Sequence, residues 1–331
     1  MTNIYVDAMG GDFAPQATVE GAVMAVKAYQ IPVTLVGRET DINKELAKYD
    51  VPRDDVRVIH ADSVIGFDEE PVYAVRHKND SSLVVALDAM KGDDNAVLVS
   101  AGSTGALLTG ALLKLGRIKG IKRPALAAPL PRMDGGRALL IDCGANADCK
   151  PLYLSQFAAM GSIYSEQILG VKNPKVALLN IGTEAEKGSM AVKEAYELLS
   201  KQSGISFIGN IESKEVLRSE ADVIVTDGFT GNILLKSIEG TSSVLMKTIK
   251  DTLMASAKGK LAGALIKSDL SGLKKQFSSD EIGGSPFLGV KGGVIKAHGS
   301  SSAYAFKNAI GQAAAYGKAD ITLRVKAALA N

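Results

Sequence analysis

The sequence has no tryptophan, and aromatic residues make up only 5% of its 331 residues. It also lacks any apolar run approaching the roughly 20 residues that a membrane-spanning helix needs. The opening residues, MTNIYVDAMGG, have none of the basic, apolar and small-residue regions of a signal peptide. These absences predict a protein that stays in the cytoplasm. The 46% apolar content excludes disorder and is enough for one large core or two ordinary ones.

Cysteine and histidine are also scarce. The two cysteines, Cys143 and Cys149, form no CxxC pattern and have no histidine nearby, so neither a zinc site nor a disulfide framework is indicated. Of three histidines, only His298 follows a predicted strand, and His60 and His77 are interpreted as structural or surface residues. Neither a GxGxxG or GxxxxGK[ST] nucleotide motif nor a metal-binding HExxH pattern occurs. We therefore expect chemistry by positioning and charge stabilisation, with no metal and no cofactor.

The formal net charge is only +2, from 38 basic and 36 acidic residues, which argues against a nucleic-acid partner unless the positive charge is concentrated. It is concentrated in residues 241–277, which carry seven lysines and two aspartates and hence a net charge of +5. Leucines recur at helical spacings among these lysines, and KGK at 258–260 is expected to break the segment into a helical hairpin. The residues expected to dock a membrane or a partner are Lys258, Lys260, Leu261, Leu265 and Lys267.

Two interpretations of this basic segment stay open. A basic amphipathic helix suits an anionic membrane surface or an acidic protein partner. A lysine-rich helix that packs on the body of the protein, or on a second subunit, would show the same pattern.

Short runs rich in β-branched and aliphatic residues recur along the chain and are typical of buried strands. They lie at residues 3–9, 33–37, 56–61, 96–101, 137–144, 175–182, 205–211, 222–228 and 292–299. Between most of them lie stretches of helical period, such as 15–29 and 104–118. This alternation predicts an α/β fold with a mainly parallel sheet and helices on both faces. Because no Gly/Ser or Pro linker divides the chain, we expect residues 1–331 to form a single unit, which can have two lobes.

Nearly every predicted strand ends in glycine and small polar residues. The strand ends read DAMGGD, SAGSTG, DCGAN, NIGTE, GNIE, TDGFTGN and AHGSS. In a parallel sheet such ends converge on one edge, where ligands of open α/β sheets bind. We therefore expect these loops to build one site. Glycine and asparagine are also common in ordinary turns, but that explanation is weaker for so many loops at the same end.

Three of these loops carry candidate binding residues. In SAGSTGA, the hydroxyls and the N–H groups at a helix start suit an anion, so a phosphate seat is predicted there. In NIGTEAEKG, a lysine that follows a polar strand end can hold a phosphate or a developing oxyanion. In DGFTGN, an asparagine at the start of an apolar helix can donate to the same oxygen. The candidates are Gly102, Ser103, Thr104, Gly105, Asn180, Thr183, Glu184, Lys187, Asp227, Thr230, Gly231 and Asn232, together with Asn146 of DCGAN and His298.

DAMGGD (7–12), SAGSTGA (100–106), DCGAN (142–146), NIGTE with KG (180–188), TDGFTGN (226–232) and KAHGSS (296–301) resemble, in order and spacing, the motifs of the bacterial phosphate acyltransferase family. The resemblance runs from about residue 4 to about residue 318. It implies transfer of a long fatty acyl group from acyl carrier protein to orthophosphate, which gives acyl phosphate for phospholipid synthesis. It also implies a fold similar to isocitrate and isopropylmalate dehydrogenases and to phosphotransacetylase.

Carried over residue by residue, the resemblance places the family's catalytic lysine at Lys187 and its catalytic asparagine at Asn232. It further implies a homodimer that associates peripherally with an anionic membrane surface. The partners implied are acylated acyl carrier protein and orthophosphate as substrates, and a membrane glycerol-phosphate acyltransferase that acts downstream.

Three other functions fit part of the sequence. A dehydrogenase of similar fold would need a carboxylate cluster for a metal, for which Asp142 and Asp227 are available, and substrate-binding arginines, which the strand-end loops lack. A phosphotransacetylase acting on acetyl coenzyme A would differ in its acyl-chain preference, and the lysine-rich segment favours the lipid enzyme. A membrane-binding scaffold without activity would leave the glycine-rich loops unexplained.

Overall fold

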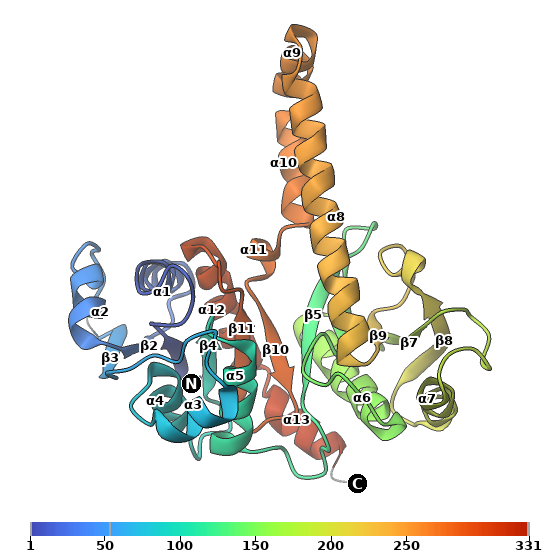
Figure 1. Cartoon of the computed structure of the whole chain (residues 1–331), viewed down its shortest axis with the longest axis horizontal. Coiled ribbons are helices and arrows are strands. Elements are labelled where there is room, and N and C mark those ends of the chain that lie inside the picture. The colour runs from blue at the N-terminus through green and yellow to red at the C-terminus, as the bar shows by residue number, and fades with distance from the viewer. Residues whose placement is uncertain (1, 53, 330–331) are drawn as a thin grey trace.

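The computed structural model describes residues 2–52 and 54–329, which fold around one eleven-stranded sheet (Figure 1). The strand order is β3-β2-β1-β4-β11-β10-β5-β6-β9-β7-β8. All nine strands predicted from the sequence are present. Two further strands, β5 (Ala125–Pro131) and β10 (Gly284–Leu288), lie at the centre of the sheet. The largest hydrophobic core includes buried side chains from both halves of the sheet, such as Val97 and Val223.

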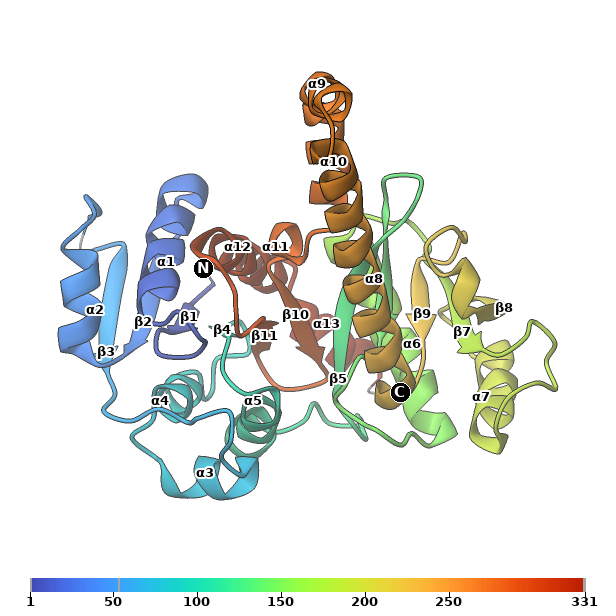
Figure 2. The same cartoon turned by 45° about the horizontal axis from the view of Figure 1, so that its top comes forward.

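The first lobe is built on five parallel strands with helices on both faces. Its strands are β1 (Ile4–Asp7), β2 (Val33–Gly37), β3 (Val56–His60), β4 (Val97–Ser100) and β11 (Gly293–Ala297). Its helices are α1 (Gln16–Tyr29), α2 (Glu39–Leu46), α3 (Pro71–His77), α4 (Ser82–Ala89), α5 (Thr104–Gly110), which continues into the π-helical turn η1 (Ala111–Leu115), and α12 (Ala303–Lys318). Figure 2 shows α1 and α12 on one side of these strands and α3, α4 and α5 on the other.

The second lobe is built on four parallel strands. These are β6 (Arg137–Ile141), β9 (Val223–Val225), β7 (Lys175–Asn180) and β8 (Ser206–Glu212). They are accompanied by α6 (Pro151–Ile168), α7 (Met190–Lys201), the 3₁₀ turn η2 (Ser213–Glu215), the start of α8 (Gly228–Met254) and α13 (Ile321–Ala328).

The two parallel groups run in opposite directions, so the expectation that all strand ends converge on one edge was wrong. The reason is that β10 is antiparallel to both β11 and β5, and β5 is antiparallel to β6. The ends of the two groups nevertheless come close. β10 meets β5 through only two residue pairs, Phe287 with Leu126 and Leu288 with Ala125. The ends of β11 and β6 each lie within a few residues of this short ladder, and they face each other across the junction of the lobes.

A long helical arm leaves the body from the second lobe (Figures 1 and 2). We call residues 241–276 the arm. It contains the outer part of α8, then α9 (Ala257–Leu265) at the tip and α10 (Lys267–Gln276), which returns toward α11 (Ser279–Ile282). None of the helices within residues 2–52 and 54–329 has both the length and the apolar character needed to cross a membrane.

The chain does not reverse at KGK as expected, because Lys258, Gly259 and Lys260 lie in the first turns of α9, whose N-cap is Ser256. Gly259 instead lets α9 fold closely against the end of α8. A Cβ at this position would lie 2.3 Å from the carbonyl oxygen of Leu253. The glycine is therefore required by helix packing rather than by a break.

The first turn of α8 packs directly on the loop that follows β6. The N–H of Gly228 donates to the carbonyl oxygen of Asn146 at 2.7 Å, and a Cβ on Gly228 would also lie 2.7 Å from that oxygen. At Gly231, a Cβ would lie 1.9 Å from the carbonyl oxygen of Asp142. These two glycines of DGFTGN thus permit close contact between the helix and the loop.

Gly231→Ala should lower the free energy of unfolding by about 1–3 kcal/mol, the usual cost of forcing an extra methyl group into rigid packing. Gly240→Ala on the same helix is the matched control, because a Cβ at Gly240 meets nothing within 4 Å. That control should be neutral or stabilise by up to about 1 kcal/mol. Urea unfolding followed by circular dichroism measures both. Equal unfolding free energies for the two variants would contradict the packing role of Gly231.

Candidate active site

A buried carboxylate organises the loop between β6 and α6. Asp142 is fully buried, and its Oδ1 accepts hydrogen bonds from the backbone N–H groups of Leu126, Gly144 and Ala145 at 3.0–3.1 Å. Its Oδ2 accepts from the backbone nitrogen and the side-chain Nδ2 of Asn146, each at 2.8 Å. Burial raises the pKa of this carboxyl, and the surrounding donors act against that rise. Asp142 therefore fixes the loop in one conformation.

A second buried carboxylate, Asp7, joins two loops of the first lobe. Ser100 Oγ donates to Asp7 Oδ2 at 2.7 Å, and the same Oγ accepts from the N–H of Gly102 at 3.1 Å. Gly10 completes this contact, because a Cβ there would lie 2.9 Å from the nitrogen of Gly102. DAMGGD and SAGSTG are thus held against each other at the ends of β1 and β4.

A cavity of about 440 Å³ lies between the lobes and is called here the inter-lobe cavity. It is lined from the first lobe by the end of β11 and from the second lobe by the loop after β6 and the first turns of α8. Three of the predicted site residues line it together, namely Thr104, Asn232 and His298. The side chain of Asn232 lies over Gly144, where a Cβ would be 3.8 Å from Asn232 Oδ1.

Two lysines that the sequence analysis did not assign to the site also line the inter-lobe cavity. Lys236 comes from α8 and Lys296 from β11, so each lobe supplies one. Burial, together with the positive charge of Lys236, lowers the pKa of Lys296 to about 8. Lys236 pairs with Glu239 at 2.7 Å, and Glu239 also pairs with His298 at 3.4 Å. Lys296 could have been found from the sequence, because a lysine is unusual in a predicted buried strand such as GVIKA.

A larger cavity of about 1120 Å³, called here the lateral cavity, lies beside the first on the second lobe. Ala147 and Phe229 line both cavities and so form their boundary. Three predicted site residues, Asn180, Asp227 and Thr230, line the lateral cavity. Asp227 also caps α8 by accepting from the backbone nitrogen and Oγ1 of Thr230 at 2.8 and 2.9 Å. The apolar lining includes Leu154, Leu179, Ile181, Val192, Ile233 and Leu234.

The loop at residues 181–187 borders the lateral cavity and carries Lys187. Asn180 anchors this loop, because its Nδ2 donates to the carbonyl oxygen of Lys187 at 3.0 Å. The stem of Lys187 lies over Gly182, where a Cβ would be 3.2 Å from Lys187 Cγ. The side chains of Thr183 and Glu184 are exposed on the same loop.

Of the two cavities described, the inter-lobe cavity has Asn232 in its lining, and neither has Lys187. Asn232 lines the inter-lobe cavity, whereas Lys187 is exposed at the rim of the lateral cavity, one residue before Gly188, which lines it. Both residues belong to the second lobe, and the two cavities meet at Phe229.

The other predicted site residues make contacts that hold the loops in place. Ser103 caps α5 by accepting from a backbone N–H at 3.4 Å, and Gly105 packs closely against α3. Asn146 donates to Asp142, as described above. Gly102 bonds Ser100 within the first lobe. The interpretation of His60 and His77 as surface residues is confirmed, because both are exposed.

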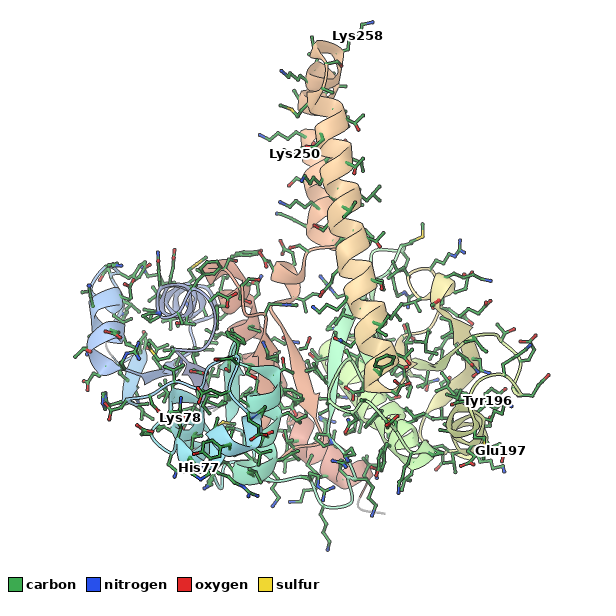
Figure 3. The ribbon with its side chains drawn as sticks, in the orientation of Figure 1. His77, Lys78, Tyr196, Glu197, Lys250 and Lys258 are labelled. Atoms are coloured by element: carbon green, nitrogen blue, oxygen red, sulfur yellow. The ribbon has the colours of Figure 1, made fainter. Side chains whose placement is uncertain are left out.

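The predicted docking residues gather at the tip of the arm. Figure 3 shows Lys258 pointing away from the tip and Lys250 projecting from the side of the arm. Leu261 and Leu265 are 66% and 76% exposed and lie four residues apart on α9. Lys260 and Lys267 are exposed beside them.

Solved structures share this fold at low sequence identity. A phosphotransacetylase from Streptococcus pyogenes superposes with a TM-score of 0.61 at 17% identity, covering 95% of this chain and 94% of that one. A 4-hydroxythreonine-4-phosphate dehydrogenase from Klebsiella pneumoniae superposes with a TM-score of 0.55 at 11% identity, covering 96% of this chain and 100% of that one. At these identities the likeness concerns the fold alone.

Sequence relatives are much closer. A family model described as "Fatty acid synthesis protein" matches residues 2–324. A phosphate acyltransferase from Clostridioides difficile (strain 630) is 49% identical over 318 residues, covering 96% of this chain and 93% of that protein. One from Alkaliphilus oremlandii (strain OhILAs) is 50% identical over 310 residues, covering 94% and 92%. Since these matches span almost the whole chain, the protein belongs to the phosphate acyltransferase family of enzymes.

Proposed function

We propose that the enzyme transfers a long-chain fatty acyl group from acyl carrier protein to orthophosphate, giving acyl phosphate for phospholipid synthesis. The observation that carries this proposal is the pair of cavities that meet at Phe229 and Ala147. The smaller one has Asn232 and two lysines in its lining. The larger one also has polar lining residues, but its leucine, isoleucine and valine side chains suit an acyl chain or the arm of a carrier.

The proposed reaction needs no covalent enzyme intermediate, because orthophosphate is already a competent nucleophile at neutral pH. One of its oxygens forms a bond to the thioester carbonyl carbon, and the carbon–sulfur bond then breaks. The sulfur leaves with the bonding electron pair and is protonated from the solvent. The enzyme must align the two substrates and stabilise the oxyanion that forms between these steps.

We place the thioester across the boundary at Phe229, with its carbonyl oxygen toward the inter-lobe cavity. Asn232 then donates from its Nδ2 to the developing oxyanion. Lys187 contributes a positive charge from the rim of the lateral cavity. Backbone N–H groups of the loop after β6 that do not bond Asp142 complete the donor set. In this proposed geometry, Asn232 acts from the inter-lobe cavity and Lys187 acts from the rim of the lateral cavity.

We also propose that the arm docks the acidic carrier protein, an anionic membrane, or both. The support is the charge of the arm and the exposure of Leu261 and Leu265 at its tip. A membrane-associated position would deliver the product to a glycerol-phosphate acyltransferase there. Exposed Val244 and Leu245 on the side of the arm suit an interface with a second copy, as expected for a homodimer.

Asn232→Ala should lower kcat by about 10²–10³-fold, or about 2.7–4 kcal/mol, the usual cost of removing one oxyanion donor. Asn43→Ala, at an exposed position of α2, is the matched control and should leave kcat unchanged. The assay supplies palmitoyl carrier protein and orthophosphate without added NAD or metal, traps acyl phosphate with hydroxylamine, and measures free thiol. Wild-type turnover by Asn232→Ala would remove this residue from the mechanism. Activity only with acetyl coenzyme A would instead favour a phosphotransacetylase.

Cys149→Ala should keep wild-type kcat, and both thiols should react more slowly in the native enzyme than in the unfolded chain. The reason is that burial raises the pKa of Cys143 well above its ordinary value and that of Cys149 to about 12. Neither thiol is therefore a thiolate at about pH 8. Labelling with a chromogenic disulfide reagent measures this. Rapid native labelling together with a large loss of kcat would point to an acyl-cysteine intermediate.

Replacing both Leu261 and Leu265 by Glu should greatly weaken sedimentation with anionic vesicles, because the substitution removes apolar area at the tip and adds negative charge. The control variant carries Leu198→Glu and Leu323→Glu, two exposed leucines on the body of the protein. It has the same change in charge and should bind vesicles as the wild type does. Equal binding by all three proteins would refute the membrane part of the proposal.

A further inference from the structure

Lys296 is a partly buried ammonium group that faces the inter-lobe cavity. Its side chain leaves the end of β11 and lines the inter-lobe cavity. Its Nζ donates to the carbonyl oxygen of Ala297. Among the ion pairs formed by the residues that the structure describes, none includes Lys296. Burying a cation costs free energy unless a negative charge accompanies it, so the Lys296 ammonium group is a candidate ligand for a bound anion.

A second ammonium group lies on the opposite wall of the same cavity. Lys236 belongs to α8 in the second lobe, and its carboxylate partner among the described residues is Glu239, which it shares with His298. Burial is the main cause of the lowered pKa of Lys296, the charge of Lys236 adds to it, and the charges of Asp12 and Asp7 act against it. Among the residues that the structure describes, the lining of this cavity thus includes two ammonium groups and no carboxylate.

The remaining lining indicates the kind of anion. Thr104 and Ser285 supply hydroxyl groups, and Asn232 supplies a carboxamide. Cationic and hydroxyl donors on different walls favour a ligand with several oxygens that can accept from each of them. A tetrahedral oxyanion meets these conditions.

We propose that Lys296 and Lys236 hold the attacking orthophosphate between the two lobes, with Lys296 as the main ligand. This inference rests on the proposed function and deepens it, because it assigns the phosphate subsite to the inter-lobe cavity and leaves the lateral cavity to the acyl donor. It also places the phosphate beside Asn232, where the oxyanion forms. The phosphate seat predicted at SAGSTGA then contributes through Thr104, since Ser103 caps a helix and Gly102 bonds Ser100.

Lys296→Met should raise KM for phosphate by about 10- to 100-fold, the range for one hydrogen bond to a charged group. KM for the acyl carrier protein substrate should stay near the wild-type value, because the acyl donor occupies the other cavity. Lys296→Arg should recover part of the phosphate affinity. Lys291→Met, at an exposed turn before β11, is the matched control and should leave both constants unchanged.

A second measurement does not depend on turnover. Inorganic phosphate should raise the Tm of the wild type and of Lys291→Met, because a ligand that binds only the folded state stabilises it. It should not raise the Tm of Lys296→Met. Sodium chloride at the same ionic strength controls for general salt effects.

The two measurements separate failure of the inference from failure of the proposed function. If phosphate stabilises the wild type but not Lys296→Met, and no acyl phosphate forms, the subsite stands and the proposed reaction is wrong. If Lys296→Met makes acyl phosphate with a wild-type KM for phosphate, the subsite is wrong and the reaction stands.

Should Lys296→Met fail to fold, Lys236→Met provides the same test, because the Lys236 side chain is 53% exposed and its loss should not disturb the core. KM for phosphate should then rise by about 3- to 10-fold. An unchanged KM for phosphate in the folded Lys236→Met enzyme would overturn the proposal.

Discussion

The buried carboxylate of Asp142 is the contact on which the rest of the site depends. It satisfies the N–H groups of the loop after β6, and a buried acceptor of this kind leaves the loop little freedom to rearrange. The carbonyl oxygen of the same residue lies against Gly231, so the first turn of α8 is seated on a rigid support. One residue thus sets both the shape of a loop and the position of a helix.

The position of α8 in turn determines which groups meet between the lobes. From its first turns the helix presents Asn232 and Lys236 to the inter-lobe cavity and Phe229 to the boundary with the lateral cavity. From the first lobe, Lys296 at the end of β11 lines the same inter-lobe cavity. The inter-lobe cavity therefore carries the two lysines, whereas the lateral cavity combines aliphatic side chains with acidic and hydroxyl groups.

The sequence predicted nine strands correctly because each is a run of β-branched and aliphatic residues with turn residues after it. It did not reveal β5 or β10, whose sequences ALAAPLP and GSPFL contain prolines that normally argue against a strand. Proline is tolerated there because β5 and β10 pair with each other over only two residue pairs. These two strands reverse the second half of the sheet, and missing them led to the wrong expectation of a single edge.

Several of the strand-end loops contribute lining residues to the two cavities, but the role of each residue depends on contacts that no local pattern contains. Gly231 and Asn146 serve the packing of the loops, because their neighbours come from distant parts of the chain. Lys296 was not predicted as a site residue, because only the folded structure brings it to the same cavity as Lys236 of the second lobe. Spacing along the chain can suggest that a loop carries polar groups. It cannot say which of them face a common space.

One continuous helix links Asn232 to the outer end of the arm, and this has a geometric consequence. From Asn232 to Met254 the helix rises about 33 Å at ~1.5 Å per residue. Because the helix is continuous over these residues, the distance between Asn232 and Met254 is fixed. A surface in contact with the tip is therefore held at a constant distance from the Asn232 carboxamide.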